Sequence, residues 1–303
     1  MSVRHFRKVT DLSPDEVAWV FERAAEVKRS PYSNTLAGKT VALIFSKPST
    51  RTRVSFSVGV HQMGGMPLFL GENELQMRKS ESIEDTARVL SRYVDAIVIR
   101  TFAQSDVDDL ASNATIPVIN ALTDERHPCQ GLTDLFTFEE RFGDARGRQI
   151  TYLGDGNNVA ESLAAAGAMR GVDVCLGVPE CYDLPAGLWD ELQVLAAAQG
   201  TRIWVERDPY RAVKNASALY ADVWISMGQA KAEEKIAALT PYRIDAALLA
   251  AARADAVVMH CLPAHRGDEI TSEVMDGPQS VVFDQAENRL HVQKALMALL
   301  LGG

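Results

Sequence analysis

The sequence predicts an α/β fold made of two doubly wound parallel-sheet domains. Apolar, β-branched runs alternate with helical patterns along the chain, and this alternation is typical of parallel sheets covered by helices. The alternation restarts at residue 146, after a long helical pattern. A length of 303 residues also suits two domains of about 150 residues each. We therefore expect a first domain up to residue 145 and a second domain from residue 146.

The first half opens with a capping box at Ser13-Pro14-Asp15-Glu16, which predicts a helix with one apolar face. The later helix patterns include a segment that ends at Gly64-Gly65, a natural stop signal. Strands are predicted at 40–45, 66–70, 96–100 and 118–120. Helices are predicted after residue 53, at 82–93, around 107–110, and from His127 to Gly143.

The second half repeats this pattern. Strands are predicted at 150–153, 172–176 and 202–205, and further apolar runs at 223–226, 257–260 and 281–283 continue the strand pattern. Helices are predicted from residue 158 to 170, at 186–198 and at 290–301. The sequence contains no internal repeat and no low-complexity tract.

The composition narrows the class of protein. The net charge is −9 and the isoelectric point is near 5.2, which argues against binding to nucleic acid or to an anionic membrane. Four scattered cysteines without a CxxC pair favour reduced thiols. The amino terminus lacks the apolar core of a signal peptide. We expect a cytoplasmic location.

The segment Ser49-Thr50-Arg51-Thr52-Arg53 predicts a phosphate site. It lies between a predicted strand and a predicted helix, where free N–H groups and the helix dipole favour an anion. Arginine adds a planar fork that matches phosphate oxygens. The alternative is that Ser49 is a plain N-cap and that Arg51 and Arg53 are solvated. The segment lacks the glycine run of a P-loop.

Polar residues follow six of the predicted strands, at the sheet edge where open parallel sheets bind ligands. A single one, such as Arg100, could be a surface ion pair, but six at one kind of edge favour an enzyme. The six segments are 49–53, 100–101, 127–130, 155–158, 226–229 and 260–263.

Two other chemistries are open at this point. Gly154-Asp155-Gly156-Asn157-Asn158-Val159 is a two-glycine version of a dinucleotide fingerprint and would fit an NAD-dependent oxidoreductase. His260, Cys261 and His265 are zinc-ligand types, although no second cluster completes four ligands. Cys261 could also be a buried, inert thiol.

Several of these motifs together resemble the aspartate/ornithine carbamoyltransferase family, and its ornithine members in particular. They are Ser49 to Arg53, His127-Pro128-x-Gln130, Asp222 followed by Ser226-Met227-Gly228, and His260-Cys261-Leu262-Pro263. The resemblance spans nearly the whole chain, from 85–90 to Glu287-Asn288-Arg289-Leu290-His291.

The resemblance implies a homotrimer, or a multiple of trimers, that transfers the carbamoyl group of carbamoyl phosphate to L-ornithine. Residues 1–145, completed by a helix at 286–303, would bind carbamoyl phosphate. Residues 146–285 would bind ornithine, and two helices would bridge the domains. It implies no cofactor and no metal, and small-molecule substrates as partners.

By position, the family's functional residues fall into three sets. The carbamoyl phosphate set is Ser49, Thr50, Arg51, Thr52, Gln76, Arg100, His127, Gln130, Cys261, Leu262 and Arg289. The ornithine set is Asn158, Asp222, Ser226 and Met227, and the catalytic set is Arg100, His127, Asp222 and Cys261.

The chemistry agrees with these sets. The side-chain amine of ornithine has a pKa of about 10.4 and must lose a proton before it attacks a carbonyl. Asp222 and Cys261 are candidates to handle that charge, while Arg100 and His127 could stabilise an oxyanion. Putrescine and N-acylornithine are alternative acceptors. Around Gln76 the segment 76–81 lacks the family's glycines, which departs from the pattern of a loop that reaches a neighbouring subunit.

Overall fold

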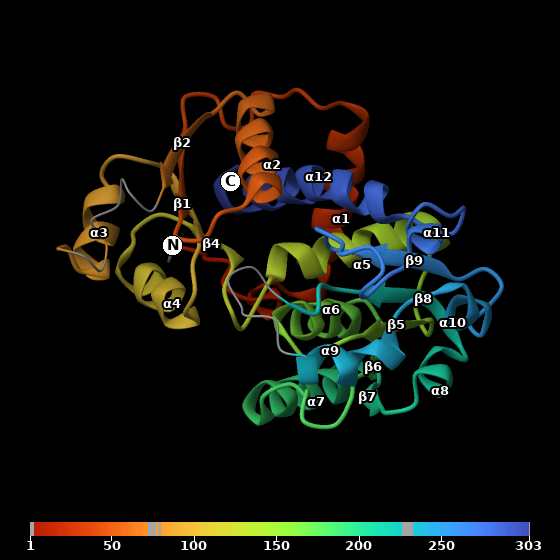
Figure 1. Cartoon of the computed structure of the whole chain (residues 1–303). Coiled ribbons are helices and arrows are strands. Elements are labelled where there is room, and N and C mark those ends of the chain that lie inside the picture. Colours follow the sequence, from red (N-terminus) through yellow and green to blue (C-terminus); the bar gives the residue numbers. More distant parts are fainter. Residues whose placement is uncertain (1–2, 72–76, 78–79, 226–232, 303) are drawn as a thin grey trace. The chain divides into compact units, whose positions relative to one another are not determined.

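The computed structural model describes residues 3–71, 77, 80–225 and 233–302. The chain forms two compact units (Figure 1). Unit 1 is Met1–Leu132 with Asn288–Gly303, and unit 2 is Thr133–Glu287. The chain passes between them within helix α5 (Pro128–Phe142) and within helix α12 (Val282–Leu301). The first crossing therefore lies inside α5, ahead of residue 145.

Unit 1 contains a four-stranded parallel sheet in the order β2-β1-β3-β4. Strand β1 pairs with β2 on one side and with β3 on the other, so the sheet is wound in both directions, as predicted. The elements are η1 Val9–Asp11, α1 Pro14–Arg29, β1 Thr40–Phe45, α2 Thr50–Gln62, β2 Met66–Gly71, α3 Ile83–Leu90, β3 Ala96–Arg100, α4 Gln104–Asn113 and β4 Val118–Leu122.

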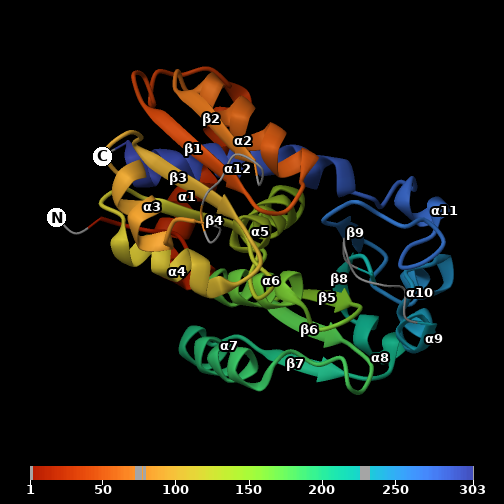
Figure 2. The same ribbon diagram turned by 60° about the vertical axis from the view of Figure 1, so that its left-hand side comes forward.

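Helices cover both faces of this sheet (Figure 2). Apolar side chains of β1 and β3 pack with those of α3 and α4 in one buried cluster. On the other side, α2 and α12 approach closely at Gly59, where an added Cβ would lie 3.1 Å from Lys294 Cγ. Lys294 Nζ also donates to Gln62 Oε1 at 2.9 Å. The carboxy-terminal helix is thus part of the core of unit 1.

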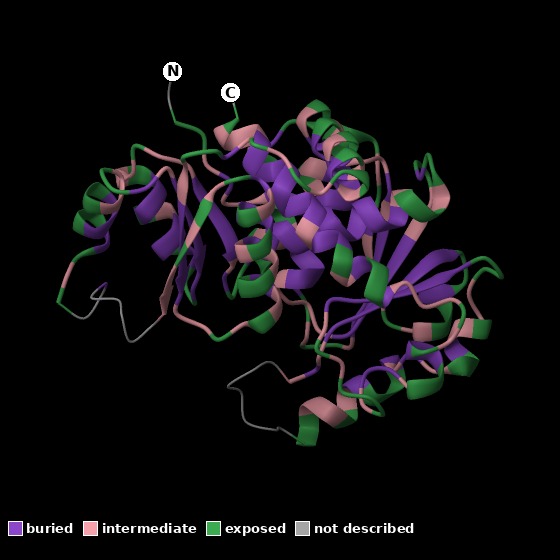
Figure 3. Cartoon of the chain, turned by 90° about the horizontal axis from the view of Figure 1, so that it is seen from above, coloured by how far each residue is buried: buried purple, intermediate pink, exposed green. Residues whose placement is uncertain are grey.

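Unit 2 contains a five-stranded parallel sheet in the order β7-β6-β5-β8-β9. Strands β5 and β8 are central and buried (Figure 3). The elements are β5 Gln149–Leu153, α6 Asn158–Met169, β6 Asp173–Gly177, α7 Ala186–Gln199, β7 Ile203–Glu206, α8 Pro209–Val213, β8 Ala216–Ala221, α9 Glu233–Leu239, η2 Thr240–Tyr242, α10 Ala246–Ala250, β9 Val257–His260 and α11 Ser272–Met275.

Two predicted strands of the second half are wrong. The strand near 223–226 is β8, which lies earlier at Ala216–Ala221 and ends before Asp222. Its composition, Ala-Ser-Ala-Leu-Tyr-Ala, has low strand propensity, but burial between β5 and β9 overrides propensity. Residues 281–283 open α12, where Gln285 N–H donates to Val281 O at 2.8 Å. The β-branched pair Val281-Val282 therefore precedes and begins a helix that starts well before residue 290.

Candidate active site

The candidate residues gather at the point in each sheet where the winding direction reverses. In unit 1 this point lies between β1 and β3, and in unit 2 it lies between β5 and β8. Ligands of doubly wound sheets bind outside the carboxyl ends of strands at such points. The anion loop follows β1, Arg100 ends β3, Asn157 follows β5 and Asp222 follows β8.

The anion loop of unit 1 (residues 46–53) leads into helix α2. Ser49 is the N-cap, and its side chain accepts the Thr52 N–H at 3.4 Å. The buried Thr52 hydroxyl in turn accepts from Arg289 Nη2 at 2.7 Å, which ties the loop to α12. The first turn of α2 carries no acidic residue to offset its dipole. Ser49 is thus a cap, and the helix end keeps its preference for an anion.

The two arginines of the loop differ in their surroundings. The Arg53 guanidinium lies over the Phe69 ring, with its Cζ 3.6 Å from the ring centroid, so it is engaged in a cation–π contact within unit 1. Arg51 lies on the same first turn and is half-buried. This difference separates an arginine that packs on the protein from one that can serve an anion.

Arg100, His127 and Arg289 form a buried basic group in unit 1. Burial holds the pKa of His127 well below its usual value, and the charges of Arg289 and Arg100 lower it further. Gln130, one turn into α5, is buried as well. Burial raises the pKa of Cys129 to about 12. The group therefore offers two guanidinium ions and a neutral imidazole, which suits a polarised carbonyl.

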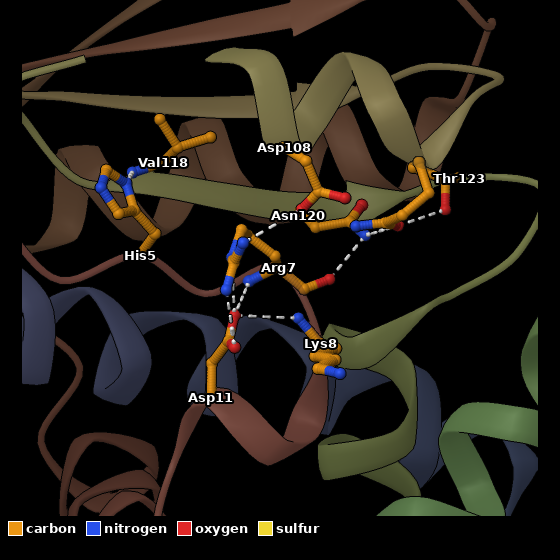
Figure 4. A network of polar contacts seen from close by, with 9 residues as sticks. His5, Arg7, Lys8, Asp11, Asp108, Val118, Asn120 and Thr123 are labelled. Carbon is orange, nitrogen blue, oxygen red and sulfur yellow. Dashed lines mark hydrogen bonds and ion pairs between the residues drawn. The ribbon is translucent and has the colours of Figure 1, made fainter. Parts of the chain in front are cut away.

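A polar network fixes the turn that leads to His127 (Figure 4). Asn120 Nδ2, in the middle of β4, donates to Arg7 O at 2.9 Å and to Gln104 Oε1 at 3.2 Å. Thr123 Oγ1 donates to Gln104 Oε1 at 2.9 Å and accepts the Arg126 N–H at 3.1 Å. The sequence analysis did not predict this network. The signal for it was the polar residue Asn120 at the end of the apolar run predicted as a strand at 118–120.

Arg7 connects the same network to the amino terminus (Figure 4). Phe6 N–H donates to Val118 O at 2.8 Å, so residues 5–7 run beside β4. His5 Nδ1 accepts the Val118 N–H at 3.2 Å, and Arg7 Nη1 lies 3.2 Å from Asp108 Oδ1. The His5 pKa is lowered by burial and by Arg7, although Asp11 opposes the shift.

His5 and His127 predict that the stability of the fold decreases in acid. Their pKa values are lower in the folded chain than the unfolded value of about 6.5. Below that pH the unfolded chain therefore binds more protons, and the free energy of unfolding falls as pH falls. The slope is at most about 1.4 kcal/mol per pH unit for each group.

Denaturant unfolding between pH 6.5 and 5 measures this effect. His127→Gln is expected to remove the larger part of the slope, and His5→Gln a smaller part. His61→Gln, at an exposed position, controls for loss of a histidine as such. An unchanged slope in His127→Gln would show that another group sets the acid sensitivity.

Asp222 and Cys261 lie together in unit 2. Cys261 Sγ donates to Asp222 Oδ1 at 2.8 Å, and Asn157 Nδ2 donates to Asp222 Oδ2 at 2.8 Å. Asn157 is the N-cap of α6, with its Oδ1 accepting from Val159 N–H and Ala160 N–H. The predicted Asn158 is the first helical residue. Asn157 was missed, and its place directly before a helix was the available signal.

The Asp222 carboxylate is buried, and among the described residues its contacts are hydrogen bonds and not ion pairs. Its side chain is 7% exposed, and its described contacts are to Asn157, Cys261 and the Val223 N–H. Within the described ranges no lysine or arginine pairs with it. Asp155 differs, since Lys235 Nζ lies 2.6 Å from its Oδ2. Burial is costly for a lone carboxylate, so Asp222 is suited to a cationic ligand.

Tyr152 belongs to the same cluster and was also missed. Its side chain is fully buried on β5 and stacks on Tyr220, with ring centroids 5.9 Å apart. Burial and the nearby Asp222, Asp155 and Cys261 raise its pKa well above the usual value. It therefore contributes a neutral phenol beside the carboxylates.

Three predicted residues, Gln76, Ser226 and Met227, lie outside the described residues. Leu262 lies directly after Cys261, with a left-handed φ of 59°. Its half-buried side chain packs against a core cluster of unit 2. Arg289 is in unit 1, beside Thr52.

The dinucleotide interpretation of residues 154–159 does not fit the structure. In such a fingerprint the second glycine leaves room for a pyrophosphate. Here a Cβ on Gly156 would lie 2.4 Å from Leu184 N, so the chain's own segment 182–184 occupies that space. Gly156 N–H also donates to Tyr182 O at 2.6 Å.

The zinc interpretation finds no support either. His260 Nε2 lies 3.0 Å from Glu269 Oε1 in a fully buried pair. In the part of the chain that the structure describes, no three histidine, cysteine or acidic side chains come together as a metal site would need. All four cysteines are described and form no disulfide. None of the described helices is long and apolar enough to span a membrane.

Fold and site together define a two-unit parallel α/β enzyme, with candidate residues at the switch point of each sheet. Family models match both halves. Residues 4–140 match the carbamoyl-P binding domain of aspartate/ornithine carbamoyltransferase, and residues 146–300 match its Asp/Orn binding domain.

Individual relatives match over nearly their full length. The chain is 50% identical over 303 residues to ornithine carbamoyltransferase of Symbiobacterium thermophilum, covering 98% of each. It is 47% identical to that of Bacillus subtilis, covering 96% of this chain and 92% of the relative. The solved Pyrococcus furiosus ornithine carbamoyltransferase has a TM-score of 0.96 at 47% identity, covering 100% of this chain and 98% of that one. The chain belongs to the aspartate/ornithine carbamoyltransferase family.

Proposed function

We propose that this protein transfers the carbamoyl group of carbamoyl phosphate to the side-chain amine of L-ornithine, giving L-citrulline and phosphate. We propose that the protein acts in the cytoplasm and that its reaction belongs to arginine biosynthesis or to arginine breakdown. Unit 1 would take carbamoyl phosphate and unit 2 would take ornithine. Putrescine and N-acylornithine are the alternative acceptors.

The observation that carries this proposal is the buried Asp222 carboxylate beside the Cys261 thiol. A buried carboxylate that has no cationic partner among the described residues favours a substrate with a side-chain ammonium group. It disfavours aspartate as the acceptor, because the side-chain carboxylate of aspartate would be repelled. The relatives named above are also ornithine carbamoyltransferases.

In unit 1 the proposed roles follow from charge. Ser49, Thr50, Arg51 and Thr52 would hold the phosphate at the start of α2, where the helix dipole adds to the arginine charge. Arg100 and His127 would donate to the carbamoyl oxygen. Gln76, Gln130 and Arg289 belong to the same carbamoyl phosphate set proposed from the family's motifs, and Cys261 and Leu262 of unit 2 complete it.

The transfer itself balances without a cofactor. The ammonium group of ornithine first loses a proton, and the neutral nitrogen attacks the carbamoyl carbon. The carbonyl electrons move to oxygen, where Arg100 and His127 stabilise the negative charge. The oxyanion collapses, the C–O bond to phosphate breaks, and Arg51 holds the departing charge. The attacking nitrogen then gives its second proton to the released phosphate, which yields citrulline and hydrogen phosphate. Asp222 and Cys261 would handle the amine proton, with Asn158, Ser226 and Met227 at the amino-acid end.

A citrulline assay tests the function directly. Purified protein with carbamoyl phosphate and L-ornithine is expected to form citrulline, while putrescine, N-acetylornithine and aspartate serve as competing acceptors. Faster turnover of putrescine or N-acetylornithine would reassign the acceptor. Oxidation of NADH would support the oxidoreductase instead.

We also propose a homotrimer, or a multiple of trimers, with shared active sites. Strand β2 is an edge of the unit 1 sheet, and its Met66 and Leu68 are exposed. Val54 and Val58, one turn apart on the adjacent α2, are exposed as well. An apolar patch on an edge strand is a liability unless another chain covers it. Closed cyclic symmetry would cover it in every subunit.

Subunit mixing tests the shared site. Gln76→Ala and Arg51→Ala homotrimers are each expected to be inactive. Mixed trimers are expected to regain part of the wild-type activity, because some sites then combine an intact Gln76 with an intact Arg51 from different subunits. Mixed trimers of verified composition without activity would show that Gln76 serves its own subunit.

A further inference from the structure

The loop that follows β9 is held by two buried side chains, His260 and Glu269. The Leu262 N–H donates to His260 Nδ1 at 2.8 Å, and His260 Nε2 lies 3.0 Å from Glu269 Oε1. The His265 N–H donates to the same carboxylate oxygen at 2.5 Å. Neither the His260 nor the Glu269 side chain is exposed to solvent. One imidazole thus joins the beginning of the loop to its far end.

The hydrogen bonds define which ring nitrogen carries the proton. Because Nδ1 accepts the Leu262 N–H, it carries no hydrogen, and the ring proton must lie on Nε2. Nε2–H then donates to Glu269 Oε1. The imidazole is committed at both nitrogens, which excludes it as a metal ligand or as a proton carrier in this arrangement.

The braced loop contains an unfavourable backbone conformation. Leu262 has φ of 59°, in the left-handed region that non-glycine residues rarely adopt. Such a conformation is unfavourable and persists only where the surroundings enforce it. The Leu262 N–H bond to His260 is a contact that does so. Cys261 lies between these two residues, so its thiol direction depends on the same bond.

We infer that His260 is a positioning residue, whose Nδ1 holds the Leu262 turn so that the Cys261 thiol stays on Asp222 and faces the substrate amine. The backbone of His260 is fixed independently, because its N–H donates to the buried Gln285 Oε1 at 2.9 Å. The imidazole can therefore be changed while the strand end keeps its support. This inference rests on the proposed function for the identity of the amine.

A pair of amide substitutions separates the two bonds of His260. In His260→Asn, the amide oxygen occupies the place of Nδ1 and can still accept the Leu262 N–H, although it no longer reaches Glu269. In His260→Gln, the amide reaches the place of Nε2 and can still bond Glu269, but the Leu262 N–H loses its acceptor. We expect His260→Asn to keep an ornithine KM within about twofold of the wild type. His260→Gln is expected to raise it about five- to tenfold, as for the loss of one hydrogen bond.

A purely structural role would give a different result. In that case both variants would lose thermal stability, and the ornithine KM would either stay unchanged in both or rise equally in both. Either result would overturn the inference. The KM for carbamoyl phosphate serves as an internal reference and is expected to change less than that for ornithine. Should His260→Gln fail to fold, His260→Asn decides alone, because a tenfold rise in its ornithine KM contradicts the role of Nδ1.

Alkylation of Cys261 gives a readout that does not depend on turnover. Iodoacetamide labelling, followed by mass spectrometry of the Cys261 peptide, is expected to proceed several-fold faster in His260→Gln than in the wild type and in His260→Asn. Equal labelling in all three would overturn the inference. If the wild type forms no citrulline while labelling follows this order, the proposed function fails and the positioning role stands.

Discussion

Replacing Arg51 with alanine is expected to lower the turnover number by about 10²- to 10³-fold, the usual effect of removing one donor that stabilises developing charge. The free energy of unfolding is expected to change by less than about 0.5 kcal/mol, because Arg51 is only half-buried, on the first turn of α2. Its charge there is unfavourable to the helix dipole, and no acidic residue in the first turn of α2 compensates for it. An anion bound at the start of α2 would offset this unfavourable interaction of the Arg51 charge with the helix dipole.

Arg53→Ala is the matched control for this prediction. Arg53 is two residues away on the same turn, but its guanidinium lies over Phe69. Its loss is expected to reduce stability by about 0.5–1 kcal/mol, as for an exposed cation–π contact, and to leave turnover largely intact. Arg51→Lys adds a further test, since lysine keeps the charge without the bidentate fork. Equal losses of turnover in Arg51→Ala and Arg53→Ala would contradict a specific phosphate role for Arg51.

Much of the fold was predictable because the strand and helix patterns are local. The first-half strands at 40–45 and 96–100 match β1 and β3, and the helix start at Ser49 follows from a hydroxyl residue directly before an apolar-periodic segment. The prediction failed where long-range burial decides. Strand β8 is alanine-rich and forms because it pairs with β5 and β9 inside the sheet, where every one of its residues is buried.

The contacts of the candidate site were less predictable than its members. Asp222 and Cys261 are 39 positions apart, and only the adjacency of β8 and β9 brings the two side chains to 2.8 Å. Residue type alone does not distinguish Arg51 from Arg53. The family resemblance selects Arg51, and the contact of Arg53 with Phe69 gives a physical reason for the difference. Likewise, the choice between Asn157 and Asn158 depends on the residue at which α6 begins. These contacts are determined by the order of the strands in the sheet and by the residue at which each helix begins. Residue types alone do not specify either.

Asp222→Asn is expected to lower kcat/KM for ornithine by about 10²- to 10⁴-fold, because removing one partner of a buried charge pair costs about 3–5 kcal/mol. The side chain keeps nearly the same shape, so the loss would reflect the charge offered to the substrate amine. In the ligand-free protein Asp222 has no cationic partner among the described residues, so the substitution breaks no ion pair with any of them. Asparagine keeps only one acceptor oxygen, so one buried hydrogen bond of Asp222 is lost, and the melting temperature without substrate is expected to fall modestly.

Asp155→Asn is the matched control, because Asp155 is a nearby carboxylate that does have a cationic partner. Asp155 is paired with Lys235 at 2.6 Å, and both side chains are largely buried. Its substitution leaves the ammonium group of Lys235 without its partner, so the melting temperature is expected to fall by more than in Asp222→Asn. Steady-state kinetics with varied ornithine and thermal unfolding of both variants provide the comparison. If Asp222→Asn retains wild-type kcat/KM for ornithine, the amine is not bound by this carboxylate, and the acceptor site must be sought elsewhere in unit 2.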